Sequence, residues 1–147
     1  MIVKQIYTQC LAQASYYIES DGESVVIDPI RDIDSYVNLL DINNSKLKFI
    51  LETHFHADFI SGHLELNKKY GAPIIFGHNA LPAYDFLGKK NGEIIEVGKV
   101  KIKIIHTPGH TLESVCYLLI DENGNDHALF TGDTLFIGDV GIPDVAQ

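Results

Sequence analysis

Two imidazoles and a carboxylate stand within five consecutive positions of the chain. They are His54, His56 and Asp58, in the segment Thr-His-Phe-His-Ala-Asp. Histidines two residues apart are weak evidence by themselves, because such pairs also occur on exposed loops. Two further groups strengthen the signal, namely His110 in Thr-Pro-Gly-His and Asp133 in Thr-Gly-Asp. Because imidazole and carboxylate suit zinc, iron and manganese, the candidate metal ligands are His54, His56, His110 and Asp133.

These residue types leave two kinds of metal site open. If His54, His110 and Asp133 bind one ion, they form a triad of two histidines and one carboxylate that leaves three positions free, as in non-heme iron(II) sites. If His56 also binds, a zinc site that activates water becomes the alternative. The residues alone do not decide between these sites.

Each polar group directly follows a short apolar run, at 47–52, 100–105 and 128–130. Strands that end at the same edge of a sheet bring their following loops together, so we expect the three groups to meet. Similar patterns predict further strands and two helices, the second of which is stopped by Gly71. The expected strands are 2–7, 15–19, 24–28, 47–52, 73–76, 93–97, 100–105, 114–120 and 127–130. The expected helices are 34–40 and 62–70, and the N-cap of the first is Asp32 or Asp34.

Two smaller expectations concern the site and the end of the chain. Tyr16 and Tyr17 are neighbours in an expected strand, so one belongs to the core and the other can form a wall of the pocket. Residues 134–147, with their glycines and proline, are expected to form an irregular loop.

Bulk composition narrows the class of protein. With 147 residues, 46% hydrophobic and 21% charged, the chain fits one globular domain. A formal charge of −9 argues against nucleic acid as a partner, because phosphate binding needs clustered lysine and arginine. No apolar stretch is long enough for a membrane span or a secretory signal, so a cytoplasmic location is expected. Two cysteines, Cys10 and Cys116, form no disulfide framework.

Four segments together resemble the successive motifs of the metallo-β-lactamase superfamily. They are Val26-Ile27-Asp28-Pro29, Thr53 to Asp58, Thr107 to Thr111 and Thr131 to Leu135. The sequence around these motifs is similar to that of the glyoxalase II-like and persulfide dioxygenase branch of the superfamily, including members fused to rhodanese domains. The resemblance implies an α/β (α+β) fold, the N-terminal half of an αβ/βα sandwich, with a mixed, mostly antiparallel sheet and helices on one face. It covers the first strand to Asp144, so residues 1–147 are expected to be one C-terminally truncated domain.

The resemblance also implies roles for the site residues. His54, His110 and Asp133 would hold one iron(II), with His56 close by as a weak ligand or a neighbour of the ligands. Asp58 would be the first ligand of a second metal in the binuclear hydrolases, whose pattern continues with a histidine. Here that position is Phe59, which cannot coordinate, so one metal is favoured. Asp58 remains a catalytic candidate that either orients an imidazole or, in a hydrolase, positions water.

The implied reaction oxidises a low-molecular-weight thiol persulfide, such as glutathione persulfide, with O2 to sulfite at iron(II). The first alternative is a glyoxalase II-like zinc hydrolase of thioesters, and the second is a catalytically inactive metal-binding fragment. The segment Gly141-Ile142-Pro143-Asp144 departs from the Gly-Arg-Pro-Asp of the family. Because the second half normally covers one sheet, we expect an apolar sheet face to be bare and two copies to pair through it.

Overall fold

A computed structural model describes residues 1–143 of the chain. Its first sheet has six strands in the order β1 to β6. The first three strands pair antiparallel, whereas β3 to β6 run parallel to one another. The strands are β1 (Ile2–Thr8), β2 (Gln13–Ser20), β3 (Glu23–Ile27), β4 (Lys46–Leu51), β5 (Ile74–Gly77) and β6 (Leu87–Lys89).

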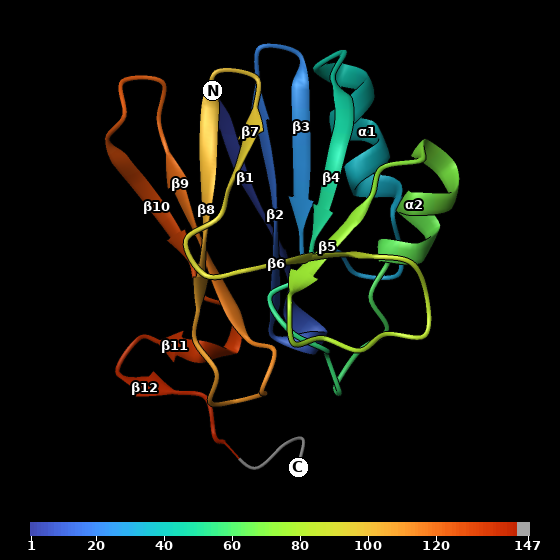
Figure 1. The fold of residues 1–147 in the computed structure, drawn as a ribbon. Coiled ribbons are helices and arrows are strands. Elements are labelled where there is room, and N and C mark those ends of the chain that lie inside the picture. Colours follow the sequence, from blue (N-terminus) through green and yellow to red (C-terminus); the bar gives the residue numbers. More distant parts are fainter. Residues whose placement is uncertain (144–147) are drawn as a thin grey trace.

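A second sheet has four antiparallel strands in the order β10, β9, β8 and β7. It packs face to face on the first sheet (Figure 1), and buried side chains of β2 to β5 share one core with it. The core between the sheets includes Ile27 and Leu51 from the first sheet and Ile102 and Tyr117 from the second. The strands are β7 (Ile94–Val97), β8 (Val100–His106), β9 (Val115–Ile120) and β10 (Asp126–Phe130).

Both α-helices cover the other face of the first sheet (Figure 1). Helix α1 (Asp34–Ile42) connects β3 to β4, and α2 (His63–Tyr70) connects β4 to β5. Such helical crossovers allow neighbouring strands to run parallel. Helix α2 ends at Gly71, whose φ of 69° lies in the left-handed region, as its position predicted.

Three details differ from the expectations. The strands divide between two packed sheets, and β6 went unpredicted because Leu87–Lys89 shows no apolar alternation. The N-cap of α1 is Ile33 rather than Asp32 or Asp34, although the Asp32 carboxylate accepts a hydrogen bond from the Asp34 amide.

The expected C-terminal loop contains a short helix and a short hairpin. Helix η2 (Gly132–Thr134) is a single 3-10 turn, as is η1 (Gln9–Leu11) near the N-terminus. Strand β11 (Leu135–Phe136) then pairs antiparallel with β12 (Asp139–Val140). The last motif position, Asp144, lies outside the described residues.

No helix within residues 1–143 covers the outer face of the second sheet (Figure 1). Leu118, Ile120 and Leu129 are partly or fully exposed there. Lys101 and Lys103 of β8 lie on this face too, so a bare apolar face and the pairing of two copies through it stay predictions. Within the same described part, no helix has the length and apolar character that crossing a membrane requires.

Candidate metal centre

The loops that follow β4, β8 and β10 lie at the same end of the two sheets (Figure 1). Strands β8 and β10 end there together because β9 runs antiparallel to both. One nitrogen each of His54 and His110 and one oxygen of Asp133 all lie within 4.8 Å of one another. The three positions that the sequence predicted as a triad thus come together.

The distances in this cluster fit a cation between the donors. Nε2 of His54 lies 3.8 Å from Oδ2 of Asp133, and Nε2 of His110 lies 3.5 Å from the same oxygen. These contacts are too long for good hydrogen bonds. Ligands about 2.1 Å from a metal, and about 90–110° apart, lie roughly 3 to 3.5 Å from one another. Slight contraction of the cluster would therefore produce a coordination shell.

Hydrogen bonds fix the orientation of the His54 ring. The Thr53 hydroxyl donates a hydrogen bond to Oδ2 of Asp28 at 2.7 Å. Its oxygen is therefore free to accept a hydrogen bond from Nδ1–H of His54 at 2.9 Å. The Thr53 amide also donates to Asp28, at 2.7 Å. Burial and the neighbouring His56 lower the pKa of His54. The ring is therefore neutral, and its Nε2 lone pair faces Asp133.

His110 is oriented in the same way from a different segment. Its Nδ1 lies 3.0 Å from the carbonyl oxygen of Ile142, which can only accept, so Nδ1 carries the proton. Nε2 of His110 therefore also presents a lone pair. Close packing of Gly141 supports this contact, because a Cβ there would lie 3.0 Å from Cβ of His110 and against the Asp133 carbonyl oxygen.

Gly132 permits the turn that aims Asp133 at the histidines. Its φ of 49° is left-handed, and a Cβ would lie 2.7 Å from Cβ of Thr53. Tyr17 is fully buried whereas Tyr16 lines a cavity beside the cluster, which confirms their predicted opposite orientations.

His56 belongs to a second cluster, together with Asp28 and Glu52. Its Nε2 lies 3.1 Å from Asp28 and 3.3 Å from Glu52. Although burial would lower the pKa of His56, the two carboxylates raise it to about 10. For the carboxylate of Asp28 the effects are opposite: burial would raise its pKa, but His56 lowers the pKa below its usual value. His56 is thus an imidazolium that neutralises buried carboxylates, and its ring centroid lies 4.2 Å from that of His54.

Asp58 is exposed and lies outside both clusters of potential ligands that the described residues form. The ring of Phe59 packs against His56, with centroids 4.3 Å apart. Sequence reasoning missed Glu52, which is buried and contacts His63 at 3.3 Å as well as His56. A charged residue at the end of an apolar strand was the available signal. The side chain of His63 is only 12% exposed.

Comparisons with known proteins agree on one family. A family model described as the Metallo-beta-lactamase superfamily matches residues 8–146. A hydroxyacylglutathione hydrolase from Pelagibacter ubique (strain HTCC1062) is 37% identical over 128 residues, which cover 83% of this chain and 51% of that protein. The chain spans about half the length of the curated relatives that it matches.

Two solved structures match nearly the whole chain. A metallo-beta-lactamase from Staphylococcus aureus subsp. aureus COL has a TM-score of 0.89 and 39% identity, over 99% of this chain and 47% of its own. ETHE1 from Myxococcus xanthus has a TM-score of 0.88 and 27% identity, over 99% of this chain and 63% of its own.

Proposed function

The chain belongs to the metallo-β-lactamase superfamily and has its fold, as the motifs predicted, and from this premise we propose that it is an iron(II)-dependent persulfide dioxygenase. Its substrate would be a low-molecular-weight thiol persulfide, oxidised with O2 to sulfite and the thiol. One observation supports this most: Nε2 of His54, Nε2 of His110 and Oδ2 of Asp133 face one another. The resemblance adds that the motif position with a histidine in the binuclear hydrolases is Phe59 here, which cannot coordinate a second metal. A single metal held by two histidines and one carboxylate suits oxygen chemistry.

The residues of the site would hold and shield the reactants. Iron(II) at this position would supply adjacent open positions for the terminal sulfur and O2. His54 and His110, fixed through Thr53 and the Ile142 carbonyl, would each offer a preoriented nitrogen. Because persulfide oxidation needs no general base, the exposed position of Asp58 is compatible with it. The protein would contribute mainly orientation of the persulfide.

Oxygen uptake tests this proposal directly. Protein loaded with iron(II) under argon is mixed with persulfides of glutathione, cysteine and N-acetylcysteamine in an oxygen electrode, and sulfite is assayed. We expect O2 consumption and sulfite formation, both lost in His110→Ala and retained in His127→Ala, a matched change at an exposed position. No O2 uptake with any of the three persulfides, by protein that contains its iron, would refute the dioxygenase proposal.

A second candidate is zinc-dependent hydrolysis of a thioester, which the curated relatives named hydroxyacylglutathione hydrolase favour. Zinc would supply an activated water. Metal analysis of protein purified without added metal discriminates, because about one iron per chain supports the dioxygenase and two zinc ions support the hydrolase. If metal-loaded protein neither consumes O2 nor cleaves a hydroxyacylglutathione thioester, the remaining reading is a catalytically inactive metal-binding domain.

A further inference from the structure

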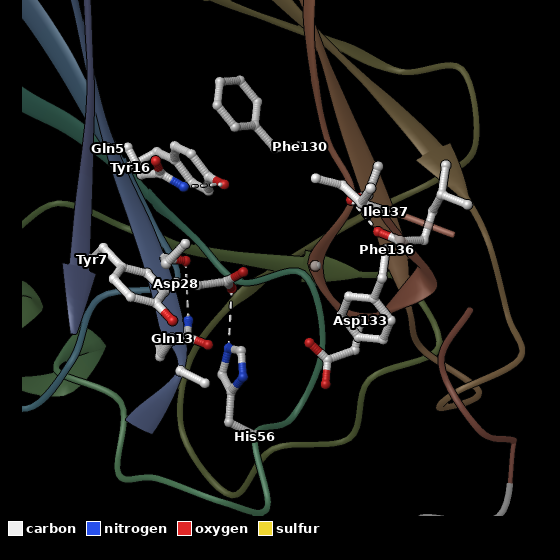
Figure 2. A pocket seen from close by; sticks show the side chains of 15 residues that line it. Gln5, Tyr7, Gln13, Tyr16, Asp28, His56, Phe130, Asp133, Phe136 and Ile137 are labelled. Carbon is white, nitrogen blue, oxygen red and sulfur yellow. Dashed lines mark hydrogen bonds and ion pairs between the residues drawn. The ribbon is translucent and has the colours of Figure 1, made fainter. Parts of the chain in front are cut away.

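A cavity of about 570 Å³ opens beside Asp133 (Figure 2). Asp133, Asp28 and His56 line the part of it next to the candidate metal centre. The remaining lining has two unlike walls. Strands β1 and β2 contribute amide and hydroxyl groups, and β10, β11 and the residue after β11 contribute a largely apolar surface. The polar side chains are Gln5, Tyr7, Gln13 and Tyr16, and the large apolar ones are Phe130, Leu135, Phe136 and Ile137.

Gln13 is the most constrained polar group of this cavity. It is only 9% exposed, and its Nε2 donates to the carbonyl oxygen of Ala14 at 3.2 Å. Because a carbonyl can only accept, this contact fixes which way the amide faces. Figure 2 shows the amide oxygen of Gln13 turned into the cavity, on the side of His56. That oxygen is an acceptor positioned for an N–H donor of a ligand.

The other polar groups of this wall add no positive charge. Gln5 and Tyr16 hydrogen bond to each other at 3.3 Å. Among residues 1–143, no lysine or arginine lines the cavity, and Nε2 of its one lining imidazole, His56, already lies 3.1 Å from Asp28 and 3.3 Å from Glu52. A ligand carboxylate placed against this wall would lose water without gaining a cationic partner, which is unfavourable. An amide or ammonium group would instead gain acceptors.

We propose that the cavity selects a thiol derivative whose body offers N–H donors and carries no carboxylate, with Gln13 as the specificity-determining residue. The inference rests on the proposed function only in placing the sulfur of the ligand at the metal. The two carbon atoms between the sulfur and the nitrogen of such a ligand would pack on Phe130 and Phe136. Its amide or ammonium nitrogen would donate a hydrogen bond to the Gln13 oxygen.

Three matched probes test the selection without any reaction: the S-methyl thioethers of N-acetylcysteamine, cysteamine and 3-mercaptopropionic acid. Their dissociation constants for the metal-loaded chain are measured by NMR titration. We expect the amide and the ammonium probes to bind at least about tenfold more tightly than the carboxylate probe, which corresponds to about 1.4 kcal/mol. Equal or tighter binding of the carboxylate probe overturns the proposal.

Substitution of Gln13 tests whether this residue discriminates between the probes. Gln13→Leu should weaken the amide probe roughly three- to tenfold, because one hydrogen bond is lost, and leave the carboxylate probe unchanged. Gln9→Leu, at an exposed position outside the cavity, is the matched control and should change neither. Equal weakening of all probes by Gln13→Leu would contradict the assigned role. If that variant does not fold, the three-probe comparison in the unchanged chain still decides.

The probes are thioethers without a terminal persulfide sulfur, so they are not substrates of the proposed reaction and their binding order is independent of turnover. Absence of O2 uptake with the expected binding order would refute the proposed reaction and leave the selection intact. Normal O2 uptake with a reversed binding order would refute the selection alone.

Discussion

The hydroxyl oxygen of Thr53 lies 2.9 Å from Nδ1 of His54, and it donates its own proton to Asp28. This contact fixes the ring so that Nε2 is free for a metal. Groups that orient a ligand in this way typically contribute 10- to 100-fold in metal affinity. We therefore expect Thr53→Val, which keeps the shape but removes the hydroxyl, to weaken metal binding by roughly that factor. Competition with a chelating dye measures the change.

Thr53→Ser is the matched control because it keeps the hydroxyl and loses only a methyl group. Its metal affinity should stay close to that of the unchanged chain. If serine and valine weaken binding equally, the packing of the methyl group rather than the hydrogen bond orients His54.

Gly132 should not tolerate a side chain. Its φ of 49° is left-handed, and an added Cβ would fall 2.7 Å from Cβ of Thr53. Strain and overpacking together should lower the free energy of unfolding of Gly132→Ala by about 2–5 kcal/mol. Gly124→Ala, at a φ of 85° with nothing within 4 Å, isolates the backbone strain and should lose about 1–2 kcal/mol. Urea denaturation of both variants makes the comparison, and equal losses would rule out the clash with Thr53.

Glu23 connects the two sheets through one carboxylate oxygen, Oε2. This atom accepts from Lys48 Nζ at 2.7 Å and from the Gly98 amide, in the turn of β7 and β8, at 2.7 Å. The hydrogen bond from Lys48 and then that from Gly98 lower the pKa of Glu23. Its contribution to stability is therefore present above the unfolded value of 4.5 and is lost as pH falls through the lower folded pKa.

Glu23→Gln should consequently lower the free energy of unfolding at pH 7, by less than about 1 kcal/mol because water screens this partly exposed pair. The difference from the unchanged chain should shrink as the pH falls below 4.5. Glu96→Gln, at an exposed position of β7, is the control variant and should not show this pH-dependent difference. A pH-independent difference between Glu23→Gln and the unchanged chain, measured by thermal unfolding, would contradict the electrostatic origin.

Tyr117 stabilises the end of β4 from the opposite sheet. Its buried hydroxyl donates to the carbonyl oxygen of Glu52 at 2.8 Å, directly before the loop that carries His54. Tyr117→Phe leaves this carbonyl without its donor and should lower the free energy of unfolding by about 1–3 kcal/mol. Tyr7→Phe, at a residue that is 59% exposed, should change this free energy by less than about 0.5 kcal/mol. Chemical denaturation that finds the two variants equally stable would show that the Tyr117 bond contributes nothing.

Local sequence determined most of the strands, both helices and the positions of the three ligand loops. The alternation of Tyr16 and Tyr17 and the stop at Gly71 could both be predicted, because each depends on a residue and its immediate neighbours. The same holds for His54, His110 and Asp133, which follow predicted strands.

Only the tertiary structure decided how the strands divide into two sheets and which groups face one another. His56, near His54 in sequence, pairs instead with Asp28, 28 residues away, and with the buried Glu52. Asp58, in the same motif, is exposed. The physical reason is that burying a carboxylate requires a counter-charge, and its source depends on how distant segments pack, which no local pattern encodes.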